Sequence, residues 1–308
     1  MPPRVLVVGS INMDLIVRCR QMPRPGETVL GQDFHTAPGG KGANQAVACA
    51  RLGAETTMVG RVGEDDFGRS LLAGLAADGV KVEPVQVTSG VASGVALIVL
   101  EEEGDNRIVV ASGANAMIGA EDAARAEALL DRCDVVLMQL EVPLAVVKRV
   151  AAAAKARDVR VVLDAGAATR DAADSHLFAS LDVLSPNEAE TEVLTGLSVR
   201  TLEEARLAAR ALWEMGAAQV VLKLGSRGAL WFRAGVERHV PAFSIDPVDT
   251  TAAGDAFTAG LAVALASGEG MDECLRRASA AGALACLTLG AQPSMPTRAQ
   301  VDVFLATR

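Results

Sequence analysis

The chain has 308 residues, of which 50% are hydrophobic and 22% are charged, a balance typical of a globular protein. Its formal net charge is −9, only 3% of its residues are aromatic, and it has no Tyr. This composition argues against a nucleic-acid partner, which requires a basic face and commonly aromatic side chains for base stacking. Any phosphate-binding site must therefore be formed by a few neighbouring residues and not by an extended basic surface.

Hydrophobic segments and cysteines bear on the cellular environment. No uninterrupted apolar segment reaches the roughly 18 residues of a membrane helix, and residues 1–20 lack the pattern of a signal peptide. The five cysteines form no Cys-x-x-Cys pair, which is typical of free thiols in a reducing compartment. We expect a cytoplasmic protein with no membrane partner.

Short β-branched runs alternate with longer helical patterns along most of the chain, which predicts βαβ units. Because the runs are almost continuously apolar, they favour a mostly parallel central sheet covered by helices on both faces, a three-layer α/β/α fold. The predicted strands are 5–8, 134–140, 160–164, 181–184 and 220–222, and the predicted helices are 44–52, 144–157, 256–266, 272–288 and 298–306.

Two regions, 12–36 and 93–111, break this alternation and have the pattern of extended, hairpin-like structure. Paired with each other, they predict a small antiparallel β lid beside the main sheet, although two ordinary peripheral hairpins remain the alternative. We therefore expect one unit whose main α/β domain spans about 1–11, 37–92 and 112–308, with the lid at about 12–36 and 93–111.

The segment Asp249–Asp255 runs directly into an apolar helical pattern and ends on a carboxylate. Free N–H groups and the helix dipole attract an anion at a helix start, and Gly254 permits close approach of a phosphate. Asp255 would then be a base beside a phosphate site. Taken alone, the segment fits equally well a helix that Asp255 merely caps.

Polar residues also follow several other predicted strands. In an open parallel sheet these strand ends share one edge, where ligands bind. Carboxylates, amides and lysines together supply the acceptors and donors that a polyol needs, although each residue singly fits a cap or a turn. The residues are Asn12, Asp14, Gly39–Asn44, Glu141 and Asn187, with Lys41 and Lys223 beside glycines.

Common nucleotide and metal motifs are missing. Gly42 follows Lys41 where a Walker sequence requires Ser or Thr, and no Gly-x-Gly-x-x-Gly follows a predicted strand. His35, His176 and His239 have no spacing that indicates a metal site, so a zinc enzyme is not expected.

Five segments together resemble the ribokinase-like, or phosphofructokinase-B, family of the carbohydrate kinase superfamily, and the resemblance covers essentially the whole chain. The segments are Gly9–Asp14, the run Pro-Gly-Gly-Lys-Gly-Ala-Asn at 38–44, Asn187 with Glu190 in an Asn-x-x-Glu pattern, Asp249–Asp255, and Gly290–Ser294. The resemblance implies ATP-dependent transfer of the γ-phosphate to the C5 hydroxyl of D-ribose, with K⁺ activation and homodimers formed through the lid.

The resemblance also implies residue roles. Asp255 would be the general base, and backbone amides of Ala252, Ala253 and Gly254 would form the anion hole. The sugar would contact Asn12, Asp14, Gly39, Gly40, Lys41, Asn44, Glu141 and Asp255. ATP would contact Asn187, Lys223, Gly225, Ser226, Gly228, Gly254 and Ser279. Glu190 would organise Mg²⁺ through water, and K⁺ would lie among Asp249, Thr251, Ala285, Thr288, Gly290 and Ser294.

One segment departs from the family pattern. Asp164-Ala165-Gly166 stands where ribokinases tend to carry Asn-Pro-Ala, which adds a carboxylate near the site. Another acceptor, such as deoxyribose, a fructose-type sugar or an adenosine-type nucleoside, therefore remains an alternative, as does a sugar-binding sensor without catalysis.

Overall fold

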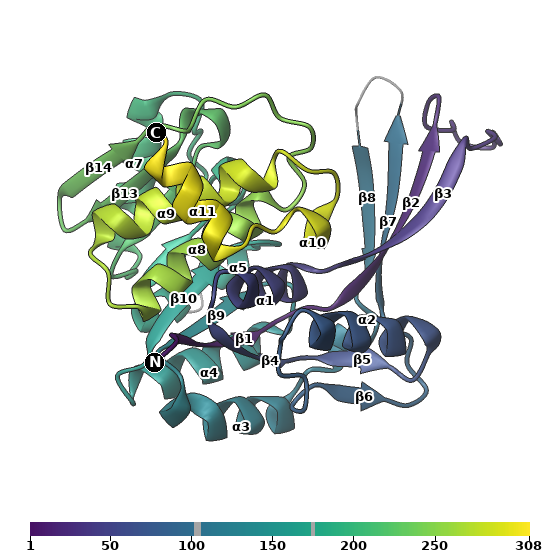
Figure 1. Cartoon of the computed structure of the whole chain (residues 1–308), viewed down its shortest axis with the longest axis horizontal. Helices are drawn as coiled ribbons and strands as arrows, with labels where there is room; N and C mark the ends of the chain where they lie inside the picture. The colour runs from purple at the N-terminus through teal and green to yellow at the C-terminus, as the bar shows by residue number, and fades with distance from the viewer. Residues whose placement is uncertain (102–105, 174–175) are drawn as a thin grey trace.

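The protein is described here by a computed structural model of residues 1–101, 106–173 and 176–308. Within these residues, eight strands form a central sheet in the order β14-β13-β12-β11-β10-β9-β1-β4 (Figure 1). The six strands from β4 to β12 are parallel, and β13 and β14 extend the sheet in antiparallel fashion. The predicted α/β class with a mostly parallel sheet is confirmed.

The elements have the following bounds. The strands of the central sheet are β1 (Arg4–Val8), β4 (Glu55–Val59), β9 (Val135–Gln139), β10 (Arg160–Asp164), β11 (Val183–Ser185), β12 (Val220–Lys223), β13 (Ala229–Arg233) and β14 (Val236–Val240). Two short strands, β5 (Arg61–Gly63) and β6 (Gln86–Thr88), pair separately. The helices are α1 (Lys41–Arg51), α2 (Asp66–Ala77), α3 (Ala120–Leu129), α4 (Leu144–Lys155), α5 (Arg170–Ala173), α6 (Glu188–Thr195), α7 (Leu202–Glu214), α8 (Ala253–Ala266), α9 (Met271–Ala285), α10 (Ala291–Ser294) and α11 (Arg298–Ala306).

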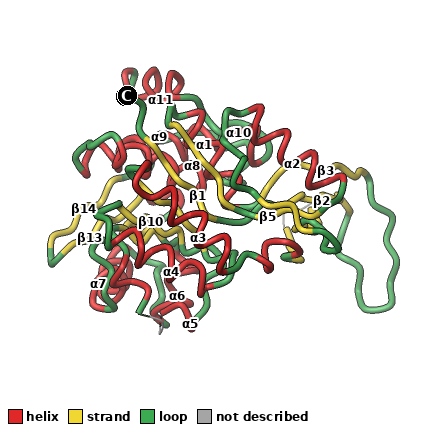
Figure 2. The backbone as a smooth tube through the Cα atoms, turned by 90° about the horizontal axis from the view of Figure 1, so that it is seen from below, coloured by secondary structure: helices red, strands yellow, loops and turns green. Residues whose placement is uncertain are grey.

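Helices cover both faces of the central sheet, as the layers in Figure 2 show. One apolar core lies between the sheet and α1, α8, α9 and α11, and a second lies between the sheet and α3, α4 and α7. The inner strands are buried along nearly their whole length because side chains on both faces meet helices. Burial on both faces explains the continuous apolar runs in the sequence.

A second sheet stands beside the main body and consists of β3 (Asp33–Gly39), β2 (Asn12–Cys19), β7 (Gly94–Glu101) and β8 (Asn106–Ala111), in that order (Figure 1). The two predicted extended regions thus pair as expected. Two of the three strand pairings are antiparallel, but the central β2–β7 pairing is parallel. The expectation of an antiparallel sheet is corrected in this respect: β2 and β7 both leave the main body from the same end, so they run side by side in one direction. The turn expected over 101–106 lies largely outside the described residues.

Several helix boundaries differ by one to three residues from those that the sequence predicts, and two of them bear on the ligand site. Helix α1 begins at Lys41 rather than at residue 44, directly after Gly40, whose φ of 86° turns the chain out of β3. Helix α9 ends at Ala285 rather than at residue 288, because the carbonyl of Cys286 accepts hydrogen bonds from the amides of Val248 and Asp249. Both of these boundaries lie beside residues that the sequence predicts to contact a ligand. Among the described residues, no helix is long and apolar enough to span a membrane.

Candidate active site

The carboxyl ends of the parallel strands and the first turns of α1 and α8 surround a cavity of about 910 Å³. The lining includes Lys41, Asn187, Lys223 and the start of α8 from Ala252 to Asp255. Asn44 and Asp255, which are hydrogen-bonded to each other at this edge, are 211 positions apart in the sequence. The structure therefore brings together at one edge the polar residues that the sequence places after separate strands.

Asp255 lies in the first turn of α8, and only 3% of its surface is exposed. Its two carboxylate oxygens accept hydrogen bonds from Asn44 Nδ2 at 3.0 Å and from Gln45 Nε2 at 2.9 Å, both from α1. Lys41 Nζ lies 3.9 Å from Oδ1. Asp255 raises the pKa of the Lys41 ammonium above its ordinary value, although burial acts in the opposite direction. Because side chains of α1 hold Asp255, its carboxylate does more than cap the start of α8.

Two further carboxylates stand near Asp255. Burial, reinforced by Glu141 and Asp255, raises the pKa of Asp14 from 3.8 to about 7. Burial also raises the pKa of Glu141, although hydrogen bonds from Ser10 Oγ at 2.5 Å and the Lys41 amide at 3.3 Å oppose that effect. Asp255 is buried and the other two acids are half-buried. Three acids this close together repel each other, and such an arrangement is characteristic of functional sites.

Neighbouring polar groups complete this acidic side of the site. Gly39 leaves room for Asp14, because a Cβ at residue 39 would lie 2.3 Å from its carboxylate. Asn44 Oδ1 is buried without a hydrogen-bond partner in the described structure, so it can accept a bond from a ligand hydroxyl. Asn12 has a different contact: its Oδ1 accepts from Asn115 Nδ2 at 2.7 Å, at the point where β2 leaves the main body.

The start of α8 has an unusual backbone. Ala252 adopts a left-handed conformation with φ of 58°, which is costly for a residue with a Cβ, by roughly 1–2 kcal/mol, and such strain is common at functional sites. The Ala253 amide donates to the Thr250 carbonyl at 3.2 Å. The next two amides, of Gly254 and Asp255, belong to the first turn and have no carbonyl one turn earlier to bond. An anion hole at this point would therefore rely on these two amides more than on that of Ala253, which is already bonded.

All seven residues expected at the nucleotide line the cavity: Asn187, Lys223, Gly225, Ser226, Gly228, Gly254 and Ser279. Ser279 Oγ is buried without a partner within the described structure. The sequence reasoning missed part of the lining, namely Ala242–Ile245, Pro247, Thr250, Phe257, Gly282, Ala283 and Cys286. Most of these residues are apolar and stand in a segment without regular secondary structure or on inner helix faces, so no polar pattern marked them.

Asp164, the residue that departs from the family pattern, is fully buried at the end of β10. Its Oδ2 accepts from Lys223 Nζ at 2.6 Å and from Thr258 Oγ1 at 2.7 Å. Although burial opposes it, the Lys223 ammonium holds the pKa of Asp164 below its ordinary value. Asp164 therefore pairs with Lys223, which lines the large cavity, rather than with Asp14 and Glu141.

Glu190 lies in the first turn of α6, where Asn187 is the N-cap residue. Both Glu190 carboxylate oxygens accept hydrogen bonds from Asn187, one from its amide at 2.8 Å and one from Nδ2 at 2.9 Å. Burial raises the pKa of Glu190. In this structure the Asn-x-x-Glu pattern forms a capping box, which fixes the two side chains against each other.

Asp249 connects the loop before α8 to the segment before α10. Its Oδ1 accepts from the Thr251 amide and hydroxyl at 2.9 and 2.7 Å, and its Oδ2 accepts from the Gly290 amide at 2.8 Å. Although partial burial opposes them, these bonds hold the pKa of Asp249 below its ordinary value. The amide of Thr288 donates to the carbonyl of Ala285 at 3.5 Å, and the hydroxyl of Ser294 donates to the carbonyl of Ala291 at 2.7 Å.

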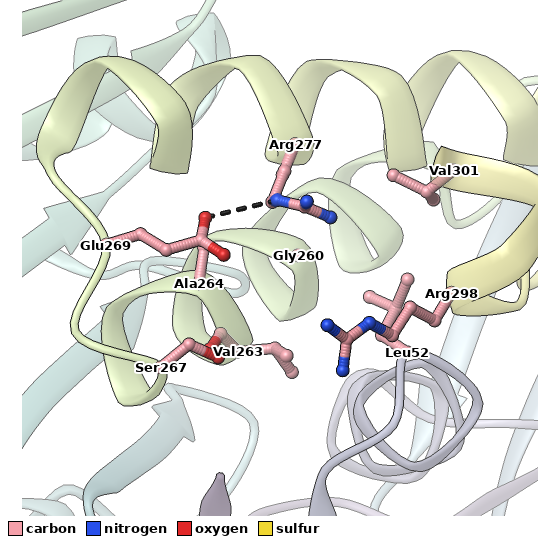
Figure 3. A pocket seen from close by; sticks show the side chains of 9 residues that line it. All are labelled: Leu52, Gly260, Val263, Ala264, Ser267, Glu269, Arg277, Arg298 and Val301. Atoms are coloured by element: carbon pink, nitrogen blue, oxygen red, sulfur yellow. Dashed lines mark hydrogen bonds and ion pairs between the residues drawn. The ribbon is translucent and has the colours of Figure 1, made fainter. Parts of the chain in front are cut away.

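A second, smaller cavity of about 30 Å³ lies between α8, α9, α11 and the end of α1 (Figure 3). Arg277 and Glu269 form an ion pair at 3.1 Å beside it. This space holds about one water molecule, so it belongs to the packing of the helices and not to a ligand site.

Comparisons with known proteins agree with this geometry. The model of the pfkB family carbohydrate kinases matches residues 2–298. A ribokinase of Bacillus subtilis is 40% identical over 302 residues, covering 98% of this chain and 99% of that protein. A deoxyribokinase of Salmonella typhi is 35% identical over 302 residues, covering 98% of both chains. The structure of Arabidopsis thaliana ribokinase complexed with ribose and ATP superposes with a TM-score of 0.89 at 36% identity, covering 99% of each chain.

The chain therefore belongs to the pfkB family of carbohydrate kinases, as the five sequence segments indicate.

The raised pKa of Asp14 predicts that this residue costs stability. The folded state holds a proton that the unfolded chain releases, so stability falls as the pH rises from about 3.8 to about 7 and is then constant. Asp14→Asn removes this penalty and should stabilise the fold at pH 8 by on the order of 2 kcal/mol, with no gain below pH 4. Urea unfolding measures the difference. Asp33→Asn, at an exposed position of the same sheet, is the matched control, and an equal gain from both variants would contradict the assignment.

Proposed function

We propose that the chain is a ribokinase, which transfers the γ-phosphate of ATP to the C5 hydroxyl of D-ribose and releases ADP and D-ribose 5-phosphate. The observation that carries the proposal is the position of Asp255. It lies between the acidic, hydroxyl-binding side of the site and the helix start that lines the large cavity. The similarity to ribokinases over nearly the whole chain supports the same conclusion.

The acidic side is proposed to bind the sugar. Asp14 and Glu141 accept hydrogen bonds from sugar hydroxyls, and the unpaired Asn44 Oδ1 accepts one more. Gly39 and Gly40 keep the backbone close to the ligand, and Asn12 fixes the strand that carries Asp14. Closure of the proposed lid, about 12–36 and 93–111, over the bound sugar excludes water, which would otherwise compete as the nucleophile.

Asp255 is proposed as the general base. It takes the proton of the C5 hydroxyl as the new oxygen–phosphorus bond forms, while the bond between the γ-phosphorus and the bridging oxygen breaks and ADP leaves. Phosphoryl transfer depends mostly on positioning and charge neutralisation. The amides at the start of α8 receive the negative charge of the transferring group, and Lys41 and Lys223 flank it.

The protein offers different numbers of ligands to the two proposed metal ions, few to Mg²⁺ and several to K⁺. Among the described residues there is no cluster of three or more His, Cys, Asp or Glu that could hold a metal by itself. Mg²⁺ would therefore be carried mainly by ATP, with Glu190 contributing through water, and it would neutralise phosphate charge. K⁺ would be held by Asp249 and by backbone oxygens of Thr251, Ala285, Thr288 and Gly290, with the Ser294 region close by. The low pKa of Asp249 keeps a negative charge there.

A homodimer formed through the lid is also proposed. The lid sheet exposes large apolar side chains, among them Phe34, Leu97, Ile108 and Val110, and such a patch favours association. Light scattering measures this oligomeric state directly.

A cytoplasmic location is also proposed. It agrees with the five free cysteines, three of which are buried.

The acceptor is tested by ADP release with D-ribose, 2-deoxy-D-ribose, D-fructose and adenosine. We expect the highest kcat/KM with D-ribose, because Asp164, the departure from the family pattern, pairs with Lys223 on the nucleotide side and leaves the sugar side unchanged. A higher kcat/KM with another acceptor would overturn the choice of ribose. A sensor would instead show a sugar-induced rise in Tm and no ADP release with any acceptor.

Replacement of the base should abolish most of the turnover. Asp255→Asn is expected to lower kcat by roughly 10² to 10⁴, the usual share of general-base catalysis, with little change in the KM for ATP. Steady-state kinetics at saturating sugar measure this effect. Turnover within a few-fold of the wild type would remove Asp255 from the mechanism.

The cation site predicts dependence on K⁺. Replacement of K⁺ by Na⁺ at constant ionic strength should lower the rate several-fold, because the smaller ion fits a ring of backbone oxygens poorly. Asp249→Asn should make the rate insensitive to this exchange. An unchanged rate in Na⁺ for the wild type counts against the assignment of Asp249.

A further inference from the structure

Two buried glutamines stand behind the proposed base. Gln45 in α1 and Gln139 at the end of β9 are both fully buried. Gln45 Nε2 donates to Asp255 Oδ1 at 2.9 Å, and Gln139 Nε2 donates to Gln45 Oε1 at 2.6 Å. The two amides thus form a chain that leads from the central sheet to the carboxylate of Asp255.

The chemistry of the groups fixes the direction of this chain. An ionised carboxylate can only accept hydrogen bonds, so Gln45 must present its NH₂ group to Asp255. Its oxygen then faces Gln139, which must in turn donate. This direction leaves Gln139 Oε1 buried without a hydrogen-bond partner in the described structure.

The surroundings hold the unpaired oxygen in place. A Cβ at Gly9 would lie 1.9 Å from Gln139 Oε1, so the oxygen occupies the space that the missing side chain of Gly9 leaves. A buried polar group without a partner is costly and uncommon in native structures. The unpaired oxygen of Gln139 is thus the cost of an arrangement that orients the Gln45 donor toward Asp255.

We propose that Gln45 and Gln139 are positioning residues for the phosphoryl transfer: Gln45 fixes the carboxylate of Asp255 through a directed hydrogen bond, and Gln139 fixes Gln45. The remaining oxygen of Asp255 is bonded by Asn44, which also reaches toward the ligand side. With Gln45 in place, the carboxylate cannot rotate away from the acceptor hydroxyl. This inference rests on the proposed role of Asp255 as the base.

The test separates positioning from stability. Gln45→Met removes the donor to Asp255 and leaves Gln139 Nε2 unpaired, so both the Tm and kcat should fall, kcat by roughly 10- to 100-fold, the loss expected for a hydrogen bond to a charged group. The double variant Gln45→Met/Gln139→Met replaces both amides by apolar side chains of similar size and should recover most of the Tm. Its kcat should remain low, while the KM for ATP stays near the wild-type value. If kcat recovers together with the Tm, the glutamines are structural only and the proposal is overturned.

A second set of variants, a double-mutant cycle of Gln45 and Asp255, tests whether Gln45 acts through Asp255. In the Asp255→Asn background, Gln45→Met should change kcat by less than about twofold, because the group that it positions is gone. An additional loss as large as in the wild-type background would contradict the proposal. If Asp255→Asn itself retains turnover, the proposed base fails, whereas a loss with Asp255→Asn and none with Gln45→Met rejects this inference alone.

The control is Gln219→Met. Gln219 directly precedes β12, so it lies at the other end of that strand from Lys223. Its Oε1 accepts a hydrogen bond from Trp231 Nε1 at 3.0 Å. This variant also removes a side-chain hydrogen bond of a glutamine, but far from the site. Its kcat should stay within twofold of the wild type, and a loss equal to that of Gln45→Met would show that the effect is not specific.

Discussion

The structure depends on one contact, in which the first turns of α1 and α8 meet through Asp255. Asn44 and Gln45 bind its two oxygens, and Lys41 approaches from the same helix. A carboxylate that is 97% buried is costly unless it is paired and hydrogen-bonded, so this network is a condition for packing α8 against α1. The same bonds orient the proposed base between the acidic side and the large cavity, which we propose bind the sugar and the nucleotide. Stability and the proposed catalysis thus rely on the same atoms.

Charge is divided across the site in a way that fits two unlike ligands. Asp14 and Glu141 stand on one side and have raised pKa values, chiefly because of burial. Lys223 stands on the other side, and Asp164 balances its charge. A neutral sugar can hydrogen-bond to the acids without adding charge, whereas ATP needs cations and free amides. Lys41 and Asp255 lie between the two sides, where we propose that the phosphoryl group is transferred.

Much of this organisation could be predicted from the sequence, because apolar runs define parallel strands and the ligand edge follows from their direction. The convergence of Asp14, Asn44, Glu141 and Asp255 was predictable for this reason. The parallel β2–β7 pairing was not, since the pattern of a strand does not determine the direction of a distant partner. Residues such as Phe243 and Ala283 line the cavity through apolar contact alone, and Gln45 and Gln139 are buried amides whose role depends on a neighbour almost a hundred residues away. The pairing of Asp164 with Lys223 was not predictable either, because the two residues are 59 positions apart in the sequence.

A crystal structure of the protein with D-ribose and a non-hydrolysable ATP analogue tests the central claim most directly. The account predicts that the C5 hydroxyl lies within roughly 3 Å of an Asp255 carboxylate oxygen and points toward the γ-phosphorus, with the phosphate at the amides of Gly254 and Asp255. A complex in which another group contacts the C5 hydroxyl, or in which the γ-phosphate lies away from the start of α8, would contradict it.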